Sequence, residues 1–119
     1  MYPVYFYKDK HGRQPVLEYM RSLSQKGDKD SRLKLNKIQE YIQVLSQFGT
    51  RAGTPYVKHI EGYIWELRPQ KCRIFFVGWI NGSYILLHHF DKKTKKTPRN
   101  EIDKAKREYN DLIQKGDQL

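Results

Sequence analysis

The sequence has little of several features that would place it in common classes of protein. It contains one cysteine, Cys72, so no disulfide can form within the chain, as is typical of proteins from a reducing cytoplasm. No apolar run approaches the roughly 20 residues that a membrane-spanning helix needs. The first residues, from Met1 to Val4, lack the basic start and apolar stretch of a secretory signal. We therefore expect a soluble, cytoplasmic protein with no membrane partner.

Motifs of the common cofactor- and metal-dependent enzymes are missing as well. There is no P-loop, no glycine-rich dinucleotide loop, no HExxH motif and no recognisable Ser-His-Asp pattern. The histidines and Cys72 show no spacing typical of zinc ligands. No sequence signature marks Cys72 as a reactive thiol, so we expect it to be a turn residue. Any chemistry is expected to use neither a metal nor a cofactor.

Acidic residues are few relative to basic ones. The chain has 23 lysines and arginines against 13 aspartates and glutamates, a net charge of +10. Such a charge raises association rates with polyanions such as nucleic acid, the ribosome or an acidic protein. A generally basic surface without a nucleic-acid role is the alternative. The excess is uneven, since a short segment holds five cations and no acid: Lys92, Lys93, Lys95, Lys96 and Arg99.

Length and periodicity predict one α+β domain over residues 1–119, with a single core. A β-branched and aromatic run predicts a strand at residues 4–7, and helical spacing predicts helices starting at Pro15 and Ser31. Four strands follow within residues 56–90. A last helix should begin with Thr97 as N-cap and Pro98 at its first position. The order β-α-α-β-β-β-β-α predicts an antiparallel sheet covered by helices on one face.

The strand register predicts one apolar and one charged sheet face. Asn81-Gly82 predicts a two-residue hairpin turn, which pairs Val77 with Leu86 and Arg73 with Phe90. A loop over residues 69–72 pairs Arg68 with Arg73 and Glu66 with Phe75. Because side chains alternate along a strand, the pairs sort into two faces. The core face carries Trp65, Leu67, Ile74, Phe76, Ile85, Leu87 and His89. The other face, expected to meet solvent, carries Ile64, Glu66, Arg68, Arg73, Phe75, Leu86, His88, Phe90 and Lys92.

Two arginines lie opposite each other on the charged face. Arg68 and Arg73 repel unless an anion lies between them, and Glu66 can neutralise only one. The other guanidinium is then free to bind phosphate oxygens bidentately. A solvated lattice of ion pairs between Glu66 and the two arginines is the alternative, and the register alone does not choose between them.

The neighbouring histidines point to opposite faces, so they cannot bind one metal together. His89 is expected to be a core histidine. His88 lies on the charged face and is a candidate for proton transfer. His59 would reach the same face if Glu61-Gly62 formed a two-residue turn.

Several motifs, in this order, resemble the RelE/ParE toxin superfamily. They are Tyr63–Arg68 (YIWELR), Arg73–Phe76 (RIFF), Ile85–Phe90 (ILLHHF), Lys92–Pro98 (KKTKKTP) and Glu101-Ile102 followed by Ala105. Within that superfamily the chain looks like the phage-derived, HigB-like toxins of bacterial type II toxin–antitoxin systems, over roughly residues 2–112. The resemblance implies a RelE-like fold: a small curved antiparallel sheet with two N-terminal helices and one C-terminal helix packed on it.

The resemblance also implies an activity and partners. The chain would be a ribosome-dependent endoribonuclease, an mRNA interferase that cuts mRNA without a metal and inhibits translation. Its partners would be a cognate helix-turn-helix antitoxin, the ribosome and mRNA. Operator DNA would be reached through the antitoxin.

The candidate catalytic roles combine the resemblance with the strand register. Arg73 matches the family arginine that stabilises phosphate, Arg68 lies opposite it, and Lys92 ends the last strand. His88 and His59 are the candidates for proton transfer. Residues expected to bind the RNA backbone are Lys58, Lys93, Lys95 and Lys96.

The sequence also departs from the best-known ribosome-dependent members. Their paired lysines are absent, and Glu66 stands in place of one of them, which leaves the general base unidentified. Two other classes stay open: a ParE-like gyrase inhibitor without ribonuclease activity, and a basic nucleic-acid-binding domain that stacks bases on Phe75 and Phe90.

Overall fold

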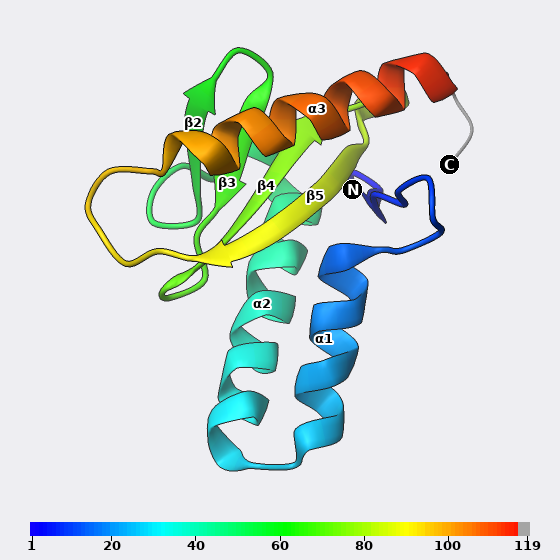
Figure 1. The fold of residues 1–119 in the computed structure, drawn as a ribbon. Helices are drawn as coiled ribbons and strands as arrows, with labels where there is room; N and C mark the ends of the chain where they lie inside the picture. The colour runs from blue at the N-terminus through cyan, green and yellow to red at the C-terminus, as the bar shows by residue number, and fades with distance from the viewer. Residues whose placement is uncertain (117–119) are drawn as a thin grey trace.

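The structure, a computed structural model, describes residues 1–116 (Figure 1). The predicted order of elements is confirmed. The elements are β1 (Val4–Phe6), α1 (Pro15–Lys26), α2 (Lys29–Phe48), β2 (Val57–Glu61), β3 (Ile64–Leu67), β4 (Cys72–Gly78), β5 (Tyr84–Asp91) and α3 (Arg99–Lys115). Two short 3-10 turns, Gly49–Ala52 and Ile80–Gly82, follow α2 and β4. None of the helices in residues 1–116 combines the length and the apolar character needed to cross a membrane.

Local sequence sets the ends of the helices. Pro15 opens α1, and Gly27 ends it with a left-handed φ of 75°. Asp28 caps α2, because its carboxylate accepts the Ser31 N–H at 2.9 Å, and the helix starts two residues before the predicted Ser31. The start of α3 differs by one residue from the prediction. Pro98 is the N-cap and not the first helical residue, since its ψ of 134° is extended.

The sheet is mixed and not wholly antiparallel. Its strand order is β1-β5-β4-β3-β2, and the β1–β5 pair is parallel while the other neighbours are antiparallel. The prediction of an antiparallel sheet is therefore wrong for β1. A parallel pair requires a crossover connection, and the whole segment from α1 to β4 separates β1 from β5 in the chain.

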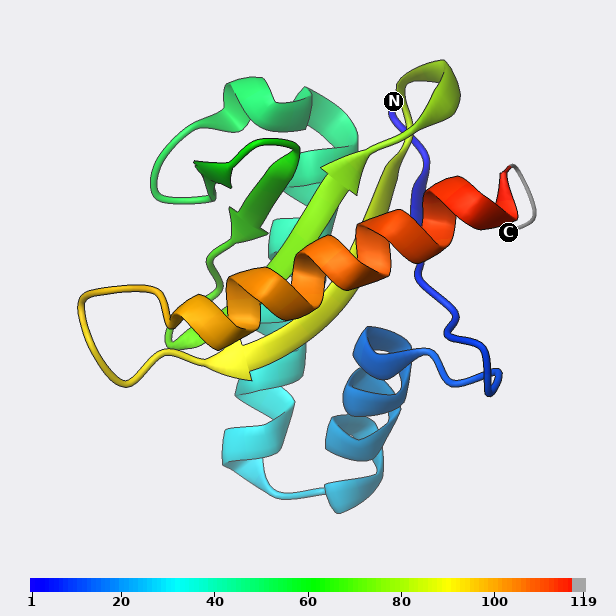
Figure 2. The ribbon, with the colours of Figure 1, turned by 45° about the horizontal axis from the view of Figure 1, so that its top comes forward.

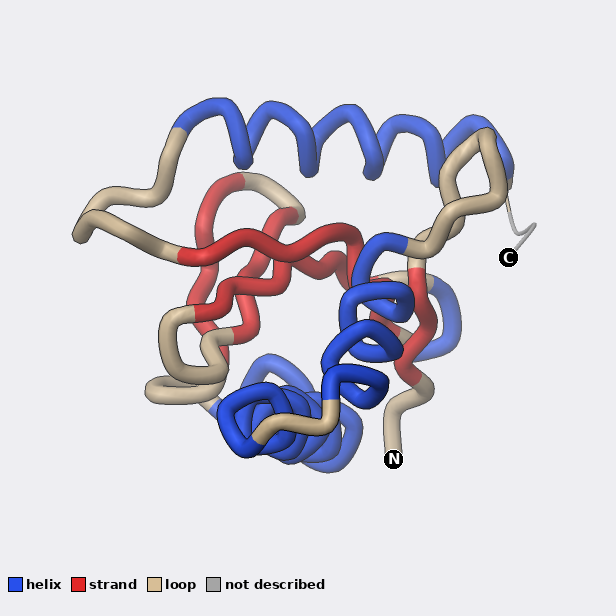
Figure 3. Tube along the Cα trace, turned by 60° about the horizontal axis from the view of Figure 1, so that its bottom comes forward, coloured by secondary structure: helices blue, strands red, loops and turns tan. Residues whose placement is uncertain are grey.

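Helices cover both faces of the sheet, which corrects the predicted single covered face. The helices α1 and α2 lie on one face, and α3 crosses the other (Figures 2 and 3). The reason is visible in β4, where the run from Ile74 to Val77 is fully buried on both sides. Phe75 and Val77 pack in a cluster with α3, whereas Ile74 and Phe76 pack in a second cluster with α1 and α2.

The β4–β5 hairpin is irregular, and this changes the predicted faces. Asn81 and Gly82 have φ of 58° and 70°, as the predicted turn requires. Arg73 pairs with Phe90 as predicted, but Val77 pairs with Ile85 and not with Leu86. The register shifts between Ile74 and Phe76, so β5 fits one extra residue opposite this point.

The shift exchanges three side chains between the two faces. Ile85 and Leu87 pack with α3, and Leu86 packs with α1 and α2, the reverse of the predicted arrangement. The surface that the sequence predicts to be solvent-facing is therefore mostly the floor of a second core beneath α3.

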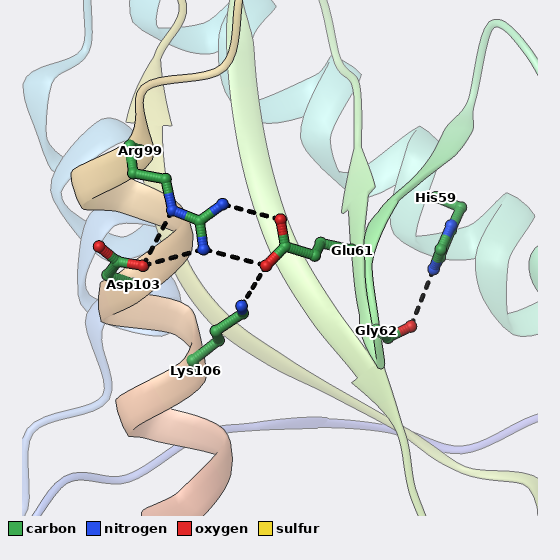
Figure 4. A network of polar contacts seen from close by, with 6 residues as sticks. All are labelled: His59, Glu61, Gly62, Arg99, Asp103 and Lys106. Atoms are coloured by element: carbon green, nitrogen blue, oxygen red, sulfur yellow. Dashed lines mark hydrogen bonds and ion pairs between the residues drawn. The ribbon is translucent and has the colours of Figure 1, made fainter.

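An ion-pair network joins α3 to Glu61 of β2, the edge strand farthest from β1 (Figure 4). Arg99 donates to both carboxylate oxygens of Glu61, at 2.8 and 2.9 Å, and Lys106 pairs with the same carboxylate. Arg99 also contacts Asp103, one turn along α3. Hydrogen bonds from Arg99 and Lys106 lower the pKa of Glu61 to about 2.

We expect Glu61→Gln to make stability less sensitive to acid. The folded pKa of about 2 lies below the usual value of 4.5, so the ionised carboxylate stabilises the fold above pH 4.5. That contribution is lost as the pH falls from 4.5 through about 2. Thermal melting followed by circular dichroism should give the variant a lower melting temperature than wild type at neutral pH. The difference between the two melting temperatures should become smaller in acid. Glu40→Gln, at an exposed site on α2, is the control, and a gap independent of pH would contradict this role of Glu61.

Candidate functional site

The β3–β4 loop brings two arginines to one buried carboxylate. The Nε atom of Arg68 lies 3.3 Å from Oε2 of Glu66, and the Nε atom of Arg73 lies 3.8 Å from the same oxygen. Glu66 pairs across the sheet with Phe75, as predicted, and with Lys58 on its other side. The predicted grouping of Arg68, Arg73 and Glu66 is therefore present in the fold.

Glu66 is fully buried, with 0% of its surface exposed. Within residues 1–116, neither of its carboxylate oxygens has a hydrogen-bond partner, and the Nε atoms of Arg68 and Arg73 have none either. Buried polar atoms are almost always hydrogen-bonded, so a group of four without a partner is unusual. These atoms keep hydrogen-bonding capacity that a hydroxyl or a phosphate oxygen could use.

Arg73 is held by its own loop. Its Nη1 atom donates to the carbonyl oxygens of Gln70, at 2.5 Å, and Cys72, at 3.0 Å. Gln70 has a left-handed φ of 57°, which turns the chain between β3 and β4. Burial lowers the pKa of the Arg73 guanidinium, and the charge of Glu66 opposes this shift. An arginine stays charged under such a shift, so Arg73 is a fixed cation.

Two lysines complete the site. Burial lowers the pKa of the Lys92 ammonium, and the nearby charges that also act on it are those of Glu66, Arg73, Lys58 and Arg68. The Lys92 N–H donates to the Lys71 carbonyl at 2.8 Å, which fixes the backbone where β5 ends. We call Lys58, Arg68, Arg73 and Lys92, with Glu66 between them, the basic cluster. Four cations and one carboxylate leave an excess of positive charge suited to an anion.

His88 does not belong to this cluster. Only 1% of its surface is exposed, because α3 covers it. Its Nδ1 atom lies 2.5 Å from Glu108 and its Nε2 atom 3.0 Å from Glu101. The predicted solvent-facing position of His88 is wrong, and the residue links β5 to α3.

Two further histidines, His59 and His89, lie on the face toward α1 and α2. His59 pairs with Trp65, and its Nε2 atom lies 2.8 Å from the Gly62 carbonyl (Figure 4). Its predicted place on the charged face is wrong, because Lys58 occupies the position opposite Glu66 and the strand bulges after His59. His89 stacks on Tyr19 of α1 at 3.9 Å, which confirms its predicted face.

The remaining predicted RNA-binding residues lie on the loop between β5 and α3, which projects from the sheet (Figure 2). Lys93, Lys95 and Lys96 are exposed there. The Thr94 hydroxyl donates to the Lys96 carbonyl at 2.9 Å, which shapes the loop tip. Because the loop begins at Lys92, it continues the basic cluster away from the sheet.

Sequence reasoning missed one member of the site as a candidate for chemistry. Glu66 was expected only to neutralise an arginine. The signal available was an acidic residue inside an otherwise apolar strand, between Trp65 and Leu67. Such a residue is rarely buried without a partner or a function.

A comparison with protein families gives one match. Residues 18–110, which are 93 of the 119, match the family described as Phage derived protein Gp49-like (DUF891). The matched segment contains every residue of the basic cluster and most of α3. A search of curated proteins found no relative.

Proposed function

Because the chain belongs to the Gp49-like family of phage-derived proteins, which is a family of RelE-like toxins, we propose that it is the HigB-like toxin of a type II toxin–antitoxin system. Its activity would be that of a ribosome-dependent endoribonuclease that cuts mRNA and stops translation. One observation carries the proposal: Arg68 and Arg73 lie against the buried carboxylate of Glu66, and Lys58 lies opposite it in the sheet.

The cluster suits cleavage of an RNA phosphodiester by its own 2′-hydroxyl. The 2′-oxygen attacks the adjacent phosphorus, the bond to the 5′-oxygen breaks, and a cyclic phosphate and a free 5′-hydroxyl result. Negative charge grows on the phosphorane oxygens during this step. Arg73 and Arg68 would bind those oxygens, and fixed cations in a partly buried site are well suited to this.

Two proton transfers complete the reaction. Glu66 is the carboxylate nearest the arginines, and neither of its oxygens has a hydrogen-bond donor within residues 1–116. We therefore assign Glu66 the role of the general base that accepts the proton of the 2′-hydroxyl. Access requires the Arg68 side chain, 24% exposed, to move onto the phosphate. Lys92 would protonate the leaving 5′-oxygen, and its lowered pKa favours release of a proton. His88 and His59 lie away from the cluster, so this assignment replaces them.

The partners follow from the same proposal. Lys58, Lys93, Lys95 and Lys96 would contact the RNA backbone, since exposed lysines near a phosphate site neutralise neighbouring phosphates. A cognate helix-turn-helix antitoxin would bind the toxin and carry it to operator DNA. The ribosome would present the mRNA, in the cytoplasm.

Expression from a tightly controlled promoter tests the activity. We expect growth arrest and new mRNA 5′ ends within reading frames, mapped by primer extension, that disappear when translation of that mRNA is blocked. Growth arrest with intact mRNA and gyrase-linked DNA breaks would contradict the proposal and indicate a ParE-like inhibitor. Intact mRNA without toxicity would contradict both toxin activities and favour a nucleic-acid-binding domain.

A further inference from the structure

A polar groove lies beside the basic cluster, on the α1–α2 side of the sheet. Its volume is about 910 Å³, within the range of roughly 300–1,000 Å³ of small-molecule sites. It lies between the long helices, the β3–β4 loop and the end of β5. Its walls include Tyr19, Lys34, Gln70, Asp91, Lys92 and Lys93.

Asp91 is a carboxylate of this groove that makes no ion pair within residues 1–116. It pairs across the sheet with Cys72, which packs on the α1–α2 side, so its side chain lies on that side too. Burial raises the pKa of Cys72 to about 12, and the charge of Asp91 adds to this shift. The same charge contributes to the raised pKa of Tyr19, after burial and the charge of Cys72. Among residues 1–116, Asp91 makes no ion pair, whereas Asp30 in the same groove pairs with Lys34 at 3.2 Å.

The groove and the basic cluster share their boundary. Lys92 lines the groove, and the charges of Glu66 and Arg73 act on its pKa after burial. The carbonyl oxygens that hold Arg73 belong to Gln70 and Cys72, which are both in the groove wall. Arg73 itself lies on the α3 side of the sheet, so a polynucleotide with one phosphate on the arginines would pass the β3–β4 loop to place a neighbouring nucleoside in the groove.

The chemistry of Asp91 selects among the bases. A carboxylate only accepts hydrogen bonds. The Watson–Crick edge of guanine offers two adjacent donors, N1–H and the 2-amino group, and matches both carboxylate oxygens. Adenine and cytosine place a ring acceptor beside their single amino group, and uracil places carbonyls on both sides of its N3–H. Unpaired RNA bases are read on this edge, while the groove lysines can take the phosphate.

We propose that the groove is a nucleotide subsite for guanine, with Asp91 as its specificity-determining residue. The inference rests on the proposed ribonuclease function, because it takes the groove to hold the nucleotide next to the cleaved phosphate. Asp91→Asn should change the choice of base without loss of the fold, since Asp91 is exposed. An amide both donates and accepts, which matches adenine.

Nucleotide binding to the purified protein tests the subsite without any cleavage. Titrations with the four nucleoside monophosphates, followed by amide chemical shifts, should show guanosine monophosphate binding about tenfold more tightly than the others. Asp91→Asn should lose that preference and favour adenosine monophosphate. Asp103→Asn, the same substitution on α3, should behave as wild type. Equal affinities, no binding, or an unchanged preference in Asp91→Asn would overturn the inference.

Mapped mRNA ends separate this inference from the proposed function. Wild type should leave guanine at a fixed position beside the cut, and Asp91→Asn should lose that bias. Cleavage with identical ends in both proteins would overturn the subsite while the ribonuclease proposal stands. Guanine-selective binding without any cleavage would support the subsite and overturn the ribonuclease proposal.

Discussion

Arg73→Ala is expected to lower mRNA cleavage by about 100- to 1,000-fold, the usual effect of removing one fixed group that stabilises a developing oxyanion. Arg73 is held in place by the carbonyls of Gln70 and Cys72, so its guanidinium needs no rearrangement when a phosphate arrives. Arg68 remains in the variant, but it is more exposed and makes no hydrogen bond to the loop in residues 1–116. The measurement is the rate of mRNA cleavage on purified translating ribosomes.

Two further variants show what is lost. Arg73→Lys keeps the charge but not the planar fork, so we expect partial activity. Arg107→Ala removes an exposed arginine from α3 and should cleave as wild type. Equal melting temperatures would show that the fold is intact. Wild-type cleavage by Arg73→Ala would exclude this arginine from the reaction.

Glu66→Gln is expected to lower cleavage by about 100- to 10,000-fold, the range for loss of a general base. Glutamine keeps the volume of the side chain but cannot accept the 2′-hydroxyl proton. It also leaves Arg68 and Arg73 close together without the anion between them, so we expect a lower melting temperature, and cleavage is compared below the melting temperature of the variant. Glu66→Asp keeps the carboxylate and should recover part of the activity.

The dependence of the cleavage rate on pH separates a base from a residue that only positions the arginines. A base stops working when it is protonated, so wild-type cleavage should fall in acid and the residual cleavage of Glu66→Gln should not. If the variant keeps the wild-type loss in acid at a reduced rate, Glu66 acts only by holding the arginine pair.

Local patterns were sufficient to predict the elements but not their layers. The helix start at Pro15 and the turn at Asn81-Gly82 depend on neighbouring residues, and both are present. The parallel β1–β5 pair depends on residues far apart in the chain. The placement of α3 depends on β4 being apolar on both faces, which alternation alone does not reveal.

In the candidate site too, positions set by local sequence were predicted correctly and a position set by a distant helix was not. Arg68 and Arg73 meet at Glu66 because one short loop joins their strands, so the register predicts them. His88 was misplaced because its surroundings come from α3. A signal existed, since Glu101 and Glu108 are seven residues apart and so share one face of a helix that carries both to one histidine.

Because β1 pairs in parallel with β5, β1 cannot join the sheet until β5 has been synthesised. Val4 pairs with Tyr84, a separation of 80 residues. At about 5–20 residues per second, ribosomes need roughly 4–16 s to make that segment. Until then β1 has no neighbour in the sheet, and Lys92 is made later still. The segment with both arginines is therefore synthesised before the edge strand can dock, and the basic cluster is complete only once Lys92 has been made.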